Sequence, residues 1–184
     1  MAALLTLTGS QVNATDALAL GIGTHVIGHE ARAEFVAGLL KLSWQRGARK
    51  TNDEVLEGYL ARQAYAGDMP DSDVDAVHVH RIDLSSLSAC ADSILALEGT
   101  SKWMDRGAAN LRAGCPITAG IIFKQLSLGP MMDLAECFMT ELAVANNCLS
   151  RPDFAEGVRA LLIDKDLSPQ WTVPQIADLP QSLV

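Results

Sequence analysis

Two pairs of histidines are the residues best suited by type and spacing to metal or acid–base chemistry. His78 and His80 are one residue apart, so in a strand both imidazoles would face one side and could share a metal ion. The sequence offers no evident third ligand, and a surface histidine pair is the better interpretation. His25 and His29 are interpreted as local hydrogen-bonding residues rather than general bases. The histidines by themselves therefore predict no catalytic site.

Aspartates gather in the clearest loop of the sequence. Residues 67–75 hold four aspartates, a proline and a glycine. Asp71, Asp73 and Asp75 alternate as in part of a calcium loop, but the glycine and the final glutamate are missing at the required spacing. The pattern favours a solvated acidic loop, and the sequence predicts no metal site.

The cysteines and the first residues of the chain indicate the cellular compartment of the protein. None of the four cysteines belongs to a CxxC pair, and we expect reduced, structural thiols, which indicates a reducing compartment. No apolar run approaches the roughly 18 residues of a membrane span. The first five residues have neither the charged region nor the cleavage site of a signal peptide. We expect a cytoplasmic protein without a membrane partner. The cysteines are Cys90, Cys115, Cys137 and Cys148.

Composition and charge exclude several classes of function. The chain has 184 residues, of which 49% are hydrophobic and 20% charged, as in a folded single domain. Its net charge is −8, and all of the excess lies after residue 66, which argues against a nucleic-acid partner. The sequence contains no GxSxG, GxGxxG, P-loop or HExxH motif.

Hydrophobic periodicity predicts a mostly α chain with at most one short strand pair. Residues 24–27 are the best strand candidate, and 74–80 could be a strand or a poor helix. Apolar residues recur at steps of three and four over 131–149, the strongest helical pattern. The last helix should bury Phe154, Val158, Leu161 and Leu162, and the proline-rich tail from Asp164 should lie extended on another part of the chain. Helices are expected at 13–21, at 29–44, from about Asp53, at 86–98, at 101–113, at 117–128, at 131–149 and after Pro152.

Segments at both ends of the chain resemble one enzyme family. Residues 5–9 (LTLTG), 13–18 (NATDAL) and 21–26 (GIGTHV) resemble the crotonase, or enoyl-CoA hydratase/isomerase, superfamily just after its catalytic core. Residues 151–166 (RPDFAEGVRALLIDKD) and 168–171 (SPQW) are similar to the C-terminus of its 3-hydroxyisobutyryl-CoA hydrolase branch. Between them, 115–118 (CPIT) and 124–126 (KQL) resemble that branch's SPTS and RQL helix, with Cys115 in place of serine.

This resemblance implies a fold and a reaction. Residues 1–28 would be the tail end of the crotonase core and 29–184 its helical C-terminal region, with the catalytic ββα core absent. Members of the branch hydrolyse 3-hydroxyisobutyryl-CoA to 3-hydroxyisobutyrate and CoA in valine breakdown, using core backbone N–H groups and carboxylates. Those groups would lie upstream of residue 5, so no catalytic residue is expected in this chain. The alternatives are a hydratase/isomerase-family fragment and a non-catalytic helical interaction module.

The resemblance also indicates which residues contact the ligand. Lys165 matches a family lysine near the CoA phosphates or adenine, and Lys124 is a weaker candidate; a solvent-exposed lysine between two aspartates is the alternative for Lys165. Trp171 should anchor the tail in an apolar groove. CoA is part of the substrate, so no separate cofactor is expected.

The expected partners are an acyl-CoA substrate, a crotonase core from the same or another chain, and further copies of this chain in a homo-oligomer. Helices that would pack on a core should expose apolar surface without it. We expect this surface near Trp171 and at the chain start, at Met1, Leu4, Leu5 and Leu7.

Overall fold

The chain forms two compact units. A computed structural model describes residues 1–75 and 81–180, so His78, His80 and most of the possible strand over 74–80 lie outside the described residues. Residues 1–11 and 75–184 make up unit 1, and residues 12–74 make up unit 2. These units divide the chain at other points than residue 28. The assignment of residues 1–28 to the end of a crotonase core rests on resemblance and stays a prediction.

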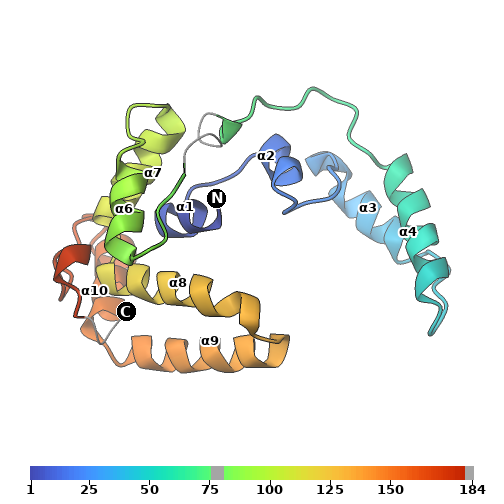
Figure 1. Cartoon of the computed structure of the whole chain (residues 1–184). Coiled ribbons are helices and arrows are strands. Elements are labelled where there is room, and N and C mark those ends of the chain that lie inside the picture. The colour runs from blue at the N-terminus through green and yellow to red at the C-terminus, as the bar shows by residue number, and fades with distance from the viewer. Residues whose placement is uncertain (76–80, 181–184) are drawn as a thin grey trace. The chain divides into compact units, whose positions relative to one another are not determined.

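Unit 1 is built around its first helix. Helix α1 contacts α6, α7 and α8, which come about 80 or more residues later in the chain (Figure 1). Leu4, Leu7 and Thr8 are buried in these contacts, so the expectation of an exposed apolar chain start was wrong for Leu4 and Leu7, while Met1 and Leu5 are partly exposed. The helices are α1 (Ala2–Thr8), α6 (Leu87–Leu95), α7 (Lys102–Ala113), α8 (Pro116–Leu128), α9 (Leu134–Leu149) and α10 (Pro152–Val158).

Polar contacts fix α7 on the end of α1. Trp103 donates from its indole Nε1 to the carbonyl of Gln11 over 2.7 Å, and the Asn110 amide donates to the carbonyl of Thr8 over 3.0 Å. The Thr8 hydroxyl donates to the carbonyl of Leu4 over 2.7 Å. Gly9 ends α1 with a left-handed φ of 60°, which glycine adopts without a Cβ clash. The buried groups of this contact are therefore satisfied within unit 1.

Local sequence signals set where the helices of unit 1 begin. The Ser86 and Ser101 hydroxyls accept from the third backbone N–H of α6 and α7, and Asp133 with Glu136 forms a capping box at the start of α9. Proline occupies the first turn of α8 and of α10, where its missing N–H costs no hydrogen bond. These helices match their predicted ranges closely because their signals lie within a few residues of each end.

Unit 2 has a thinner core. It contains α2 (Ala14–Ala19), α3 (Arg32–Leu39) and α4 (Arg49–Arg62), with a 3-10 turn at His29–Ala31 before α3. The Tyr59 hydroxyl donates to the carbonyl of Phe35 over 2.7 Å, and the two rings lie 5.3 Å apart. Helix α4 starts four residues before the predicted Asp53, and Arg49 pairs with Asp53 across this added turn at 3.7 Å.

The buried carboxylate of Asp16 ties α2 to the acidic loop. Asn13 caps α2 by accepting from the Asp16 N–H over 3.0 Å. The Asp16 side chain accepts from the Ser72 hydroxyl over 2.6 Å and from the Asp73 N–H over 3.1 Å. The sequence of Asn13 to Asp16 has capping-box form, and the structure shows its first half. The Asp16 carboxylate binds the loop after residue 70 instead.

The predicted strand over 24–27 was wrong. This segment has no regular secondary structure, and among the described residues its backbone contact with a distant segment is one hydrogen bond, from the Tyr65 N–H to the carbonyl of Val26 over 2.9 Å. A strand needs a continuous ladder with a partner, and a single bond does not provide one. Over residues 1–75 and 81–180 the chain contains helices and no strand, which confirms the mostly α class. None of the helices described is both long and apolar enough to cross a bilayer.

Candidate functional site

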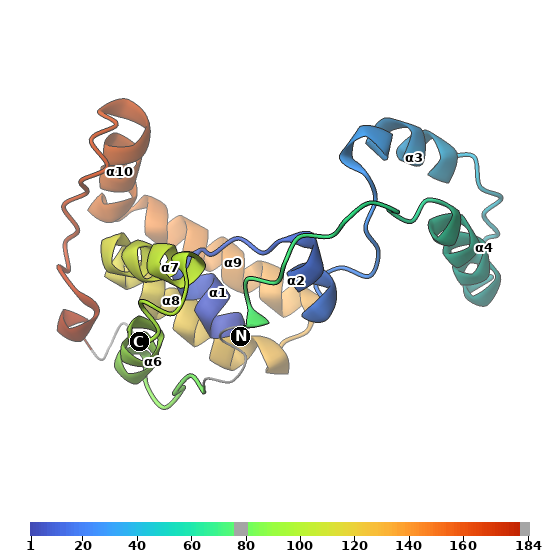
Figure 2. The same cartoon turned by 90° about the horizontal axis from the view of Figure 1, so that it is seen from above.

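The start of α10 is tied to the C-terminal tail. Asp153, in the first turn of α10, is 8% exposed and accepts from Thr172 twice, from its N–H over 2.7 Å and from its hydroxyl over 2.6 Å. Figure 2 shows the tail as an extended chain that leaves α10 and ends in the 3-10 turn Ile176–Asp178. That turn packs on α6 and α8, which confirms that the tail lies on other helices.

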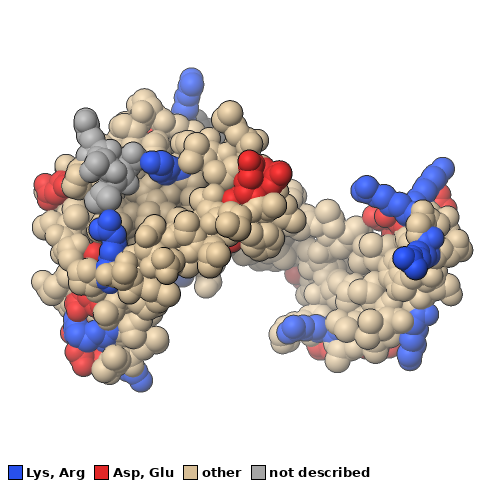
Figure 3. Space-filling model, turned by 90° about the horizontal axis from the view of Figure 1, so that it is seen from below, with Lys and Arg blue, Asp and Glu red and all other residues tan. Residues whose placement is uncertain are grey.

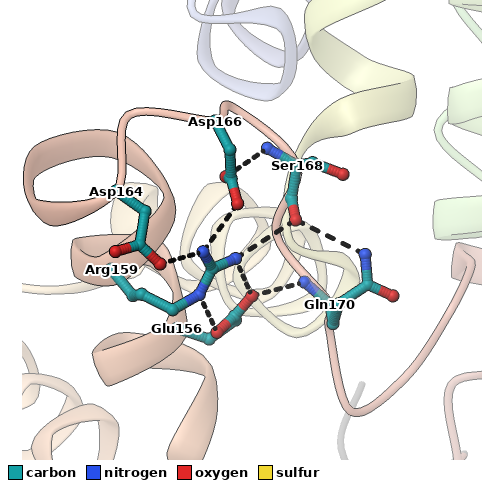
Figure 4. A network of polar contacts seen from close by, with 6 residues as sticks. All are labelled: Glu156, Arg159, Asp164, Asp166, Ser168 and Gln170. Atoms are coloured by element: carbon teal, nitrogen blue, oxygen red, sulfur yellow. Dashed lines mark hydrogen bonds and ion pairs between the residues drawn. The ribbon is translucent and has the colours of Figure 1, made fainter.

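A single arginine organises the segment that follows α10. Arg159 begins a π-helical turn, Arg159–Ile163, and its guanidinium binds three carboxylates (Figure 4). Glu156 receives two of its N–H groups, over 2.8 and 2.9 Å, while Asp164 and Asp166 share Nη1 over 2.6 and 2.7 Å. We call these four residues the Arg159 cluster. One planar donor set therefore joins the end of α10 to the turn seven residues later.

Charge pairing shifts the titration of the cluster. The Arg159 guanidinium, followed by the backbone N–H of Gln170, lowers the pKa of Glu156 from 4.5 to about 2. Arg159, followed by the Ser168 N–H, also holds the pKa of Asp166 below its ordinary value, and the carboxylates raise the pKa of Arg159 itself. All these charges persist at neutral pH, so the cluster remains an ionic contact across the physiological range.

The turn closed by Arg159 contains two residues in a left-handed backbone conformation. Lys165 has a φ of 56° and Leu167 a φ of 53°, and they are the non-glycine residues with positive φ in the described chain. Such backbone is unfavourable for a residue with a Cβ and persists where its surroundings impose it. The Leu167 N–H donates to the carbonyl of Ala160 over 3.1 Å, and the Ser168 N–H donates to Asp166 over 2.9 Å.

The two predicted ligand residues occupy separate elements. Lys165 lies in this turn and Lys124 lies on α8, and both are exposed. No hydrogen bond or ion pair joins either ammonium to another described residue. The structure does not bring the two lysines into contact with one another. Their predicted contact with CoA stays a prediction.

An open apolar groove of about 830 Å³ lies in unit 1, between α1, α7, α8, α10 and the tail. Trp171 lines it, with its indole N–H donating to the carbonyl of Ala113 over 3.0 Å, and its ring lies against Gly157. This confirms Trp171 as an anchor of the tail. The predicted buried face of the last helix was wrong: Phe154, Leu161 and Leu162 also line the groove but are 50–63% exposed, because no described segment covers them.

Helix α9 exposes its apolar face. The charged residues within it and at its cap are all acidic: Asp133, Glu136 and Glu141. Figure 3 views the side of unit 1 on which α9 lies in Figure 1, and most of the surface there is uncharged. The apolar residues that recur along the helix and the turn before it are 63–84% exposed: Met131, Leu134, Phe138, Leu142 and Leu149. The exposed apolar surface therefore exists in the groove beside Trp171, where it was predicted, and also on α9, where it was not.

The remaining candidate residues, His25, the aspartates of the acidic loop and the cysteines, make local contacts or none that indicate a site. His25 hydrogen-bonds Thr24 over 2.9 Å and lies 3.6 Å from Glu57, in agreement with a local role. The acidic loop is held by α2, with the Asn13 amide donating to the carbonyl of Asp71 over 2.8 Å. Within the described part of the chain, no group of three or more potential ligands could hold a metal ion. The four cysteines are free thiols.

Arg159 is the functional candidate that sequence reasoning missed. The family-like segment 151–166 contains this arginine, but the resemblance assigns it no role. Glu156 precedes it by one helical turn, a spacing that favours an ion pair, and Asp164 and Asp166 follow within seven residues. Three acids around one arginine are therefore visible in the sequence, whereas their convergence depends on the π-helical turn and the left-handed residues after it.

The fold and the groove together define the class of protein: a helical region with an open apolar groove beside a lysine-bearing turn. The chain belongs to the enoyl-CoA hydratase/isomerase family, whose profile matches residues 1–184. The resemblance found at both ends of the sequence is thus confirmed along the whole chain.

Curated relatives refine this placement. The chain is 27% identical over 182 residues to the mitochondrial 3-hydroxyisobutyryl-CoA hydrolase of Dictyostelium discoideum, covering 98% of this chain and 46% of that protein. The human protein of the same name is 28% identical over 96% of this chain and 45% of its own length. Small ribosomal subunit protein mS47 of Arabidopsis thaliana is 27% identical over 98% and 44%. The chain spans less than half the length of each relative.

Proposed function

We propose that this chain is the acyl-CoA-binding helical part of a thioester hydrolase that converts 3-hydroxyisobutyryl-CoA and water to 3-hydroxyisobutyrate and CoA. Lys165, with Lys124 as a second contact, binds the anionic end of CoA. A crotonase core, in the same or another chain, supplies the oxyanion hole and the carboxylates. CoA enters as part of the substrate, and no separate cofactor is required.

The observation that carries this proposal is the exposed lysine in a fixed turn. Asp164 and Asp166 flank Lys165, but both carboxylates are engaged by Arg159, so neither forms an ion pair with the lysine. The ammonium is left for a ligand in solution, and a phosphate is the anion that a mobile lysine serves well. Leu167, two residues later, lines the apolar groove. An amphipathic ligand with a phosphate end and an apolar end suits this neighbourhood.

The proposal is tested by titrating coenzyme A into the purified chain and into its Lys165→Glu variant. Backbone amide shifts in an NMR spectrum detect dissociation constants into the millimolar range. Reversing the charge of an exposed phosphate contact should weaken binding about threefold to tenfold. Lys124→Glu should show a smaller loss in the same direction.

Lys102→Glu is the matched control, because Lys102 is also an exposed lysine of unit 1 and does not line the groove. Its CoA affinity should equal that of the unchanged chain. Equal affinities for the unchanged chain and Lys165→Glu would remove Lys165 from the site. Absence of any CoA binding by the unchanged chain would overturn the proposed ligand.

A second candidate is a non-catalytic helical module that binds another macromolecule. The similarity to small ribosomal subunit protein mS47 supports this candidate, because the chain is 27% identical both to that protein and to a hydrolase relative. The exposed apolar face of α9 would then be the contact surface rather than Lys165. The titration separates the two candidates, because such a module predicts no CoA binding and no effect of Lys165→Glu.

A further inference from the structure

The Arg159 cluster holds the turn in which Lys165 lies, and this inference rests on the proposed function. The guanidinium reaches Asp164 just before Lys165, Asp166 just after it, and the carbonyl of Ser168 over 3.3 Å (Figure 4). A residue whose two neighbours are both fixed by one group has little freedom of its own. The backbone of Lys165 is therefore set by a side chain that itself belongs to the preceding helical segment.

Left-handed backbone needs such a constraint. A lysine or leucine in this conformation is strained by its Cβ, and a free turn would relax to negative φ. Lys165 and Leu167 alternate with Asp166 in the same turn, so Arg159 binds the residue between the two strained positions. Relaxation at either position would carry the Lys165 side chain to a different direction.

We propose that Arg159 is a positioning residue, which binds Glu156, Asp164 and Asp166 and thereby holds the 164–168 turn in the backbone conformation that presents Lys165 to the phosphates of an acyl-CoA. Arg159 does not contact the ligand itself. The cluster and the turn together carry three carboxylates and two cations, Arg159 and Lys165, so they do not form a basic patch. Within the turn, a phosphate would therefore be bound by the Lys165 ammonium alone, at the end of its long side chain.

Arginine suits this role and lysine does not. A planar guanidinium offers five N–H donors in fixed directions, and oxygen atoms of four residues accept from them here. A lysine ammonium keeps the charge but has three donors and no planar geometry. Arg159→Lys should consequently fail to restore the turn, which separates positioning from simple charge neutralisation.

The test compares CoA affinity for the unchanged chain, Arg159→Gln, Lys165→Gln and the double variant, by NMR titration with coenzyme A. Arg159→Gln and Lys165→Gln should each weaken binding, by about twofold to fivefold. The double variant should bind no more weakly than Lys165→Gln alone, because a misplaced turn has no further effect once the lysine is gone. The three-bond coupling between the amide and α hydrogens of residues 165 and 167 reports φ and should change in Arg159→Gln.

Arg112→Gln is the matched control, since Arg112 also pairs with a carboxylate, Glu98, through both terminal nitrogens in unit 1 but does not contact the turn. It should leave CoA affinity unchanged. If Arg159→Gln does not fold, Asp164→Asn combined with Asp166→Asn releases the same turn at exposed sites and should show the same non-additivity.

The outcomes separate this inference from the proposed function. Weaker binding by Lys165→Gln with unchanged binding by Arg159→Gln overturns positioning and leaves the CoA site standing. Equal losses that add in the double variant show that Arg159 acts on the fold at large, which also overturns positioning. No effect of Lys165→Gln removes the CoA contact and the inference with it.

Discussion

At the scale of single residues, Gly107 determines how closely α7 approaches the end of α1. A Cβ at Gly107 would lie 2.9 Å from the Ser10 hydroxyl oxygen and 3.3 Å from the Cβ of Thr8. Gly107→Ala should therefore destabilise unit 1 by about 1–2 kcal/mol, because overpacking outweighs the better helix propensity of alanine. Urea unfolding monitored by circular dichroism measures the change.

Gly58 provides the opposite expectation for the same substitution. It also lies inside a helix, α4, but the nearest atom to an added Cβ is the flexible end of Arg62, at 3.8 Å. Gly58→Ala should leave stability unchanged or raise it by about 0.5–1 kcal/mol. If both variants shifted the unfolding free energy equally, close packing at Gly107 would not be the cause.

Glu156 makes the Arg159 cluster sensitive to acid. Its pKa is lowered from 4.5 to about 2 in the folded chain, so it stabilises the fold fully above pH 4.5. This contribution should be lost progressively as the pH falls from about 4.5 to about 2. We expect the difference in Tm between the unchanged chain and Glu156→Gln to shrink over that window. A difference independent of pH would contradict the ion pair with Arg159.

Among single residues, the sequence predicted the helix caps better than the site. The Asn13 cap and the prolines of the first turns depend on neighbours within four positions, and the structure contains them. The roles of Arg159 and Asp16 depend on partners brought together by the fold. For Asp16 those partners are 56 and 57 positions away, beyond the range of any local pattern.

At the scale of elements, α9 shows what periodicity can and cannot predict. Apolar residues at steps of three and four indicated a helix and an apolar face, and both are present. Periodicity does not indicate what covers that face, because a covering segment can lie anywhere in the chain or in another chain. The same limit explains the error for Phe154, Leu161 and Leu162, whose apolar face opens on the groove.

We expect the α9 face to drive self-association, as a homo-oligomer would require. Leu142 is 64% exposed in the middle of this face. Leu142→Glu should leave the helix content unchanged, because an exposed side chain contributes little to the core, and should shift the chain toward the monomer. Light scattering after size-exclusion chromatography measures the mass of the unchanged chain and of Leu142→Glu.

Val144 gives the matched control on the same helix. It lies two residues from Leu142 and is only partly exposed. The side chain of Val144 is therefore less accessible to solvent than that of Leu142. Val144→Glu should lower thermal stability, since a charge placed against apolar neighbours loses hydration. A monomeric unchanged chain at high micromolar concentration would contradict association through α9.

At the scale of the whole molecule, we expect no turnover of 3-hydroxyisobutyryl-CoA by the purified chain. The resemblance assigns the oxyanion N–H groups and the carboxylates to a part of the family fold upstream of residue 5. Loss of one oxyanion donor alone typically costs about 10²–10³ in rate. Free CoA release, followed with a thiol reagent against a blank without protein, should stay at the background rate. Turnover above that rate would show that the chain contains its own catalytic groups.

The way unit 1 closes has a consequence for synthesis on the ribosome. Helix α1 is synthesised before unit 2, and its partners α7 and α8 begin about 100 residues after it, beyond all of unit 2. At about 5–20 residues per second, the apolar side of α1 remains without its native partners for roughly 5–20 s. Nascent chains of this protein should therefore bind chaperones until residue 128 has left the exit tunnel, and release should coincide with burial of Leu4.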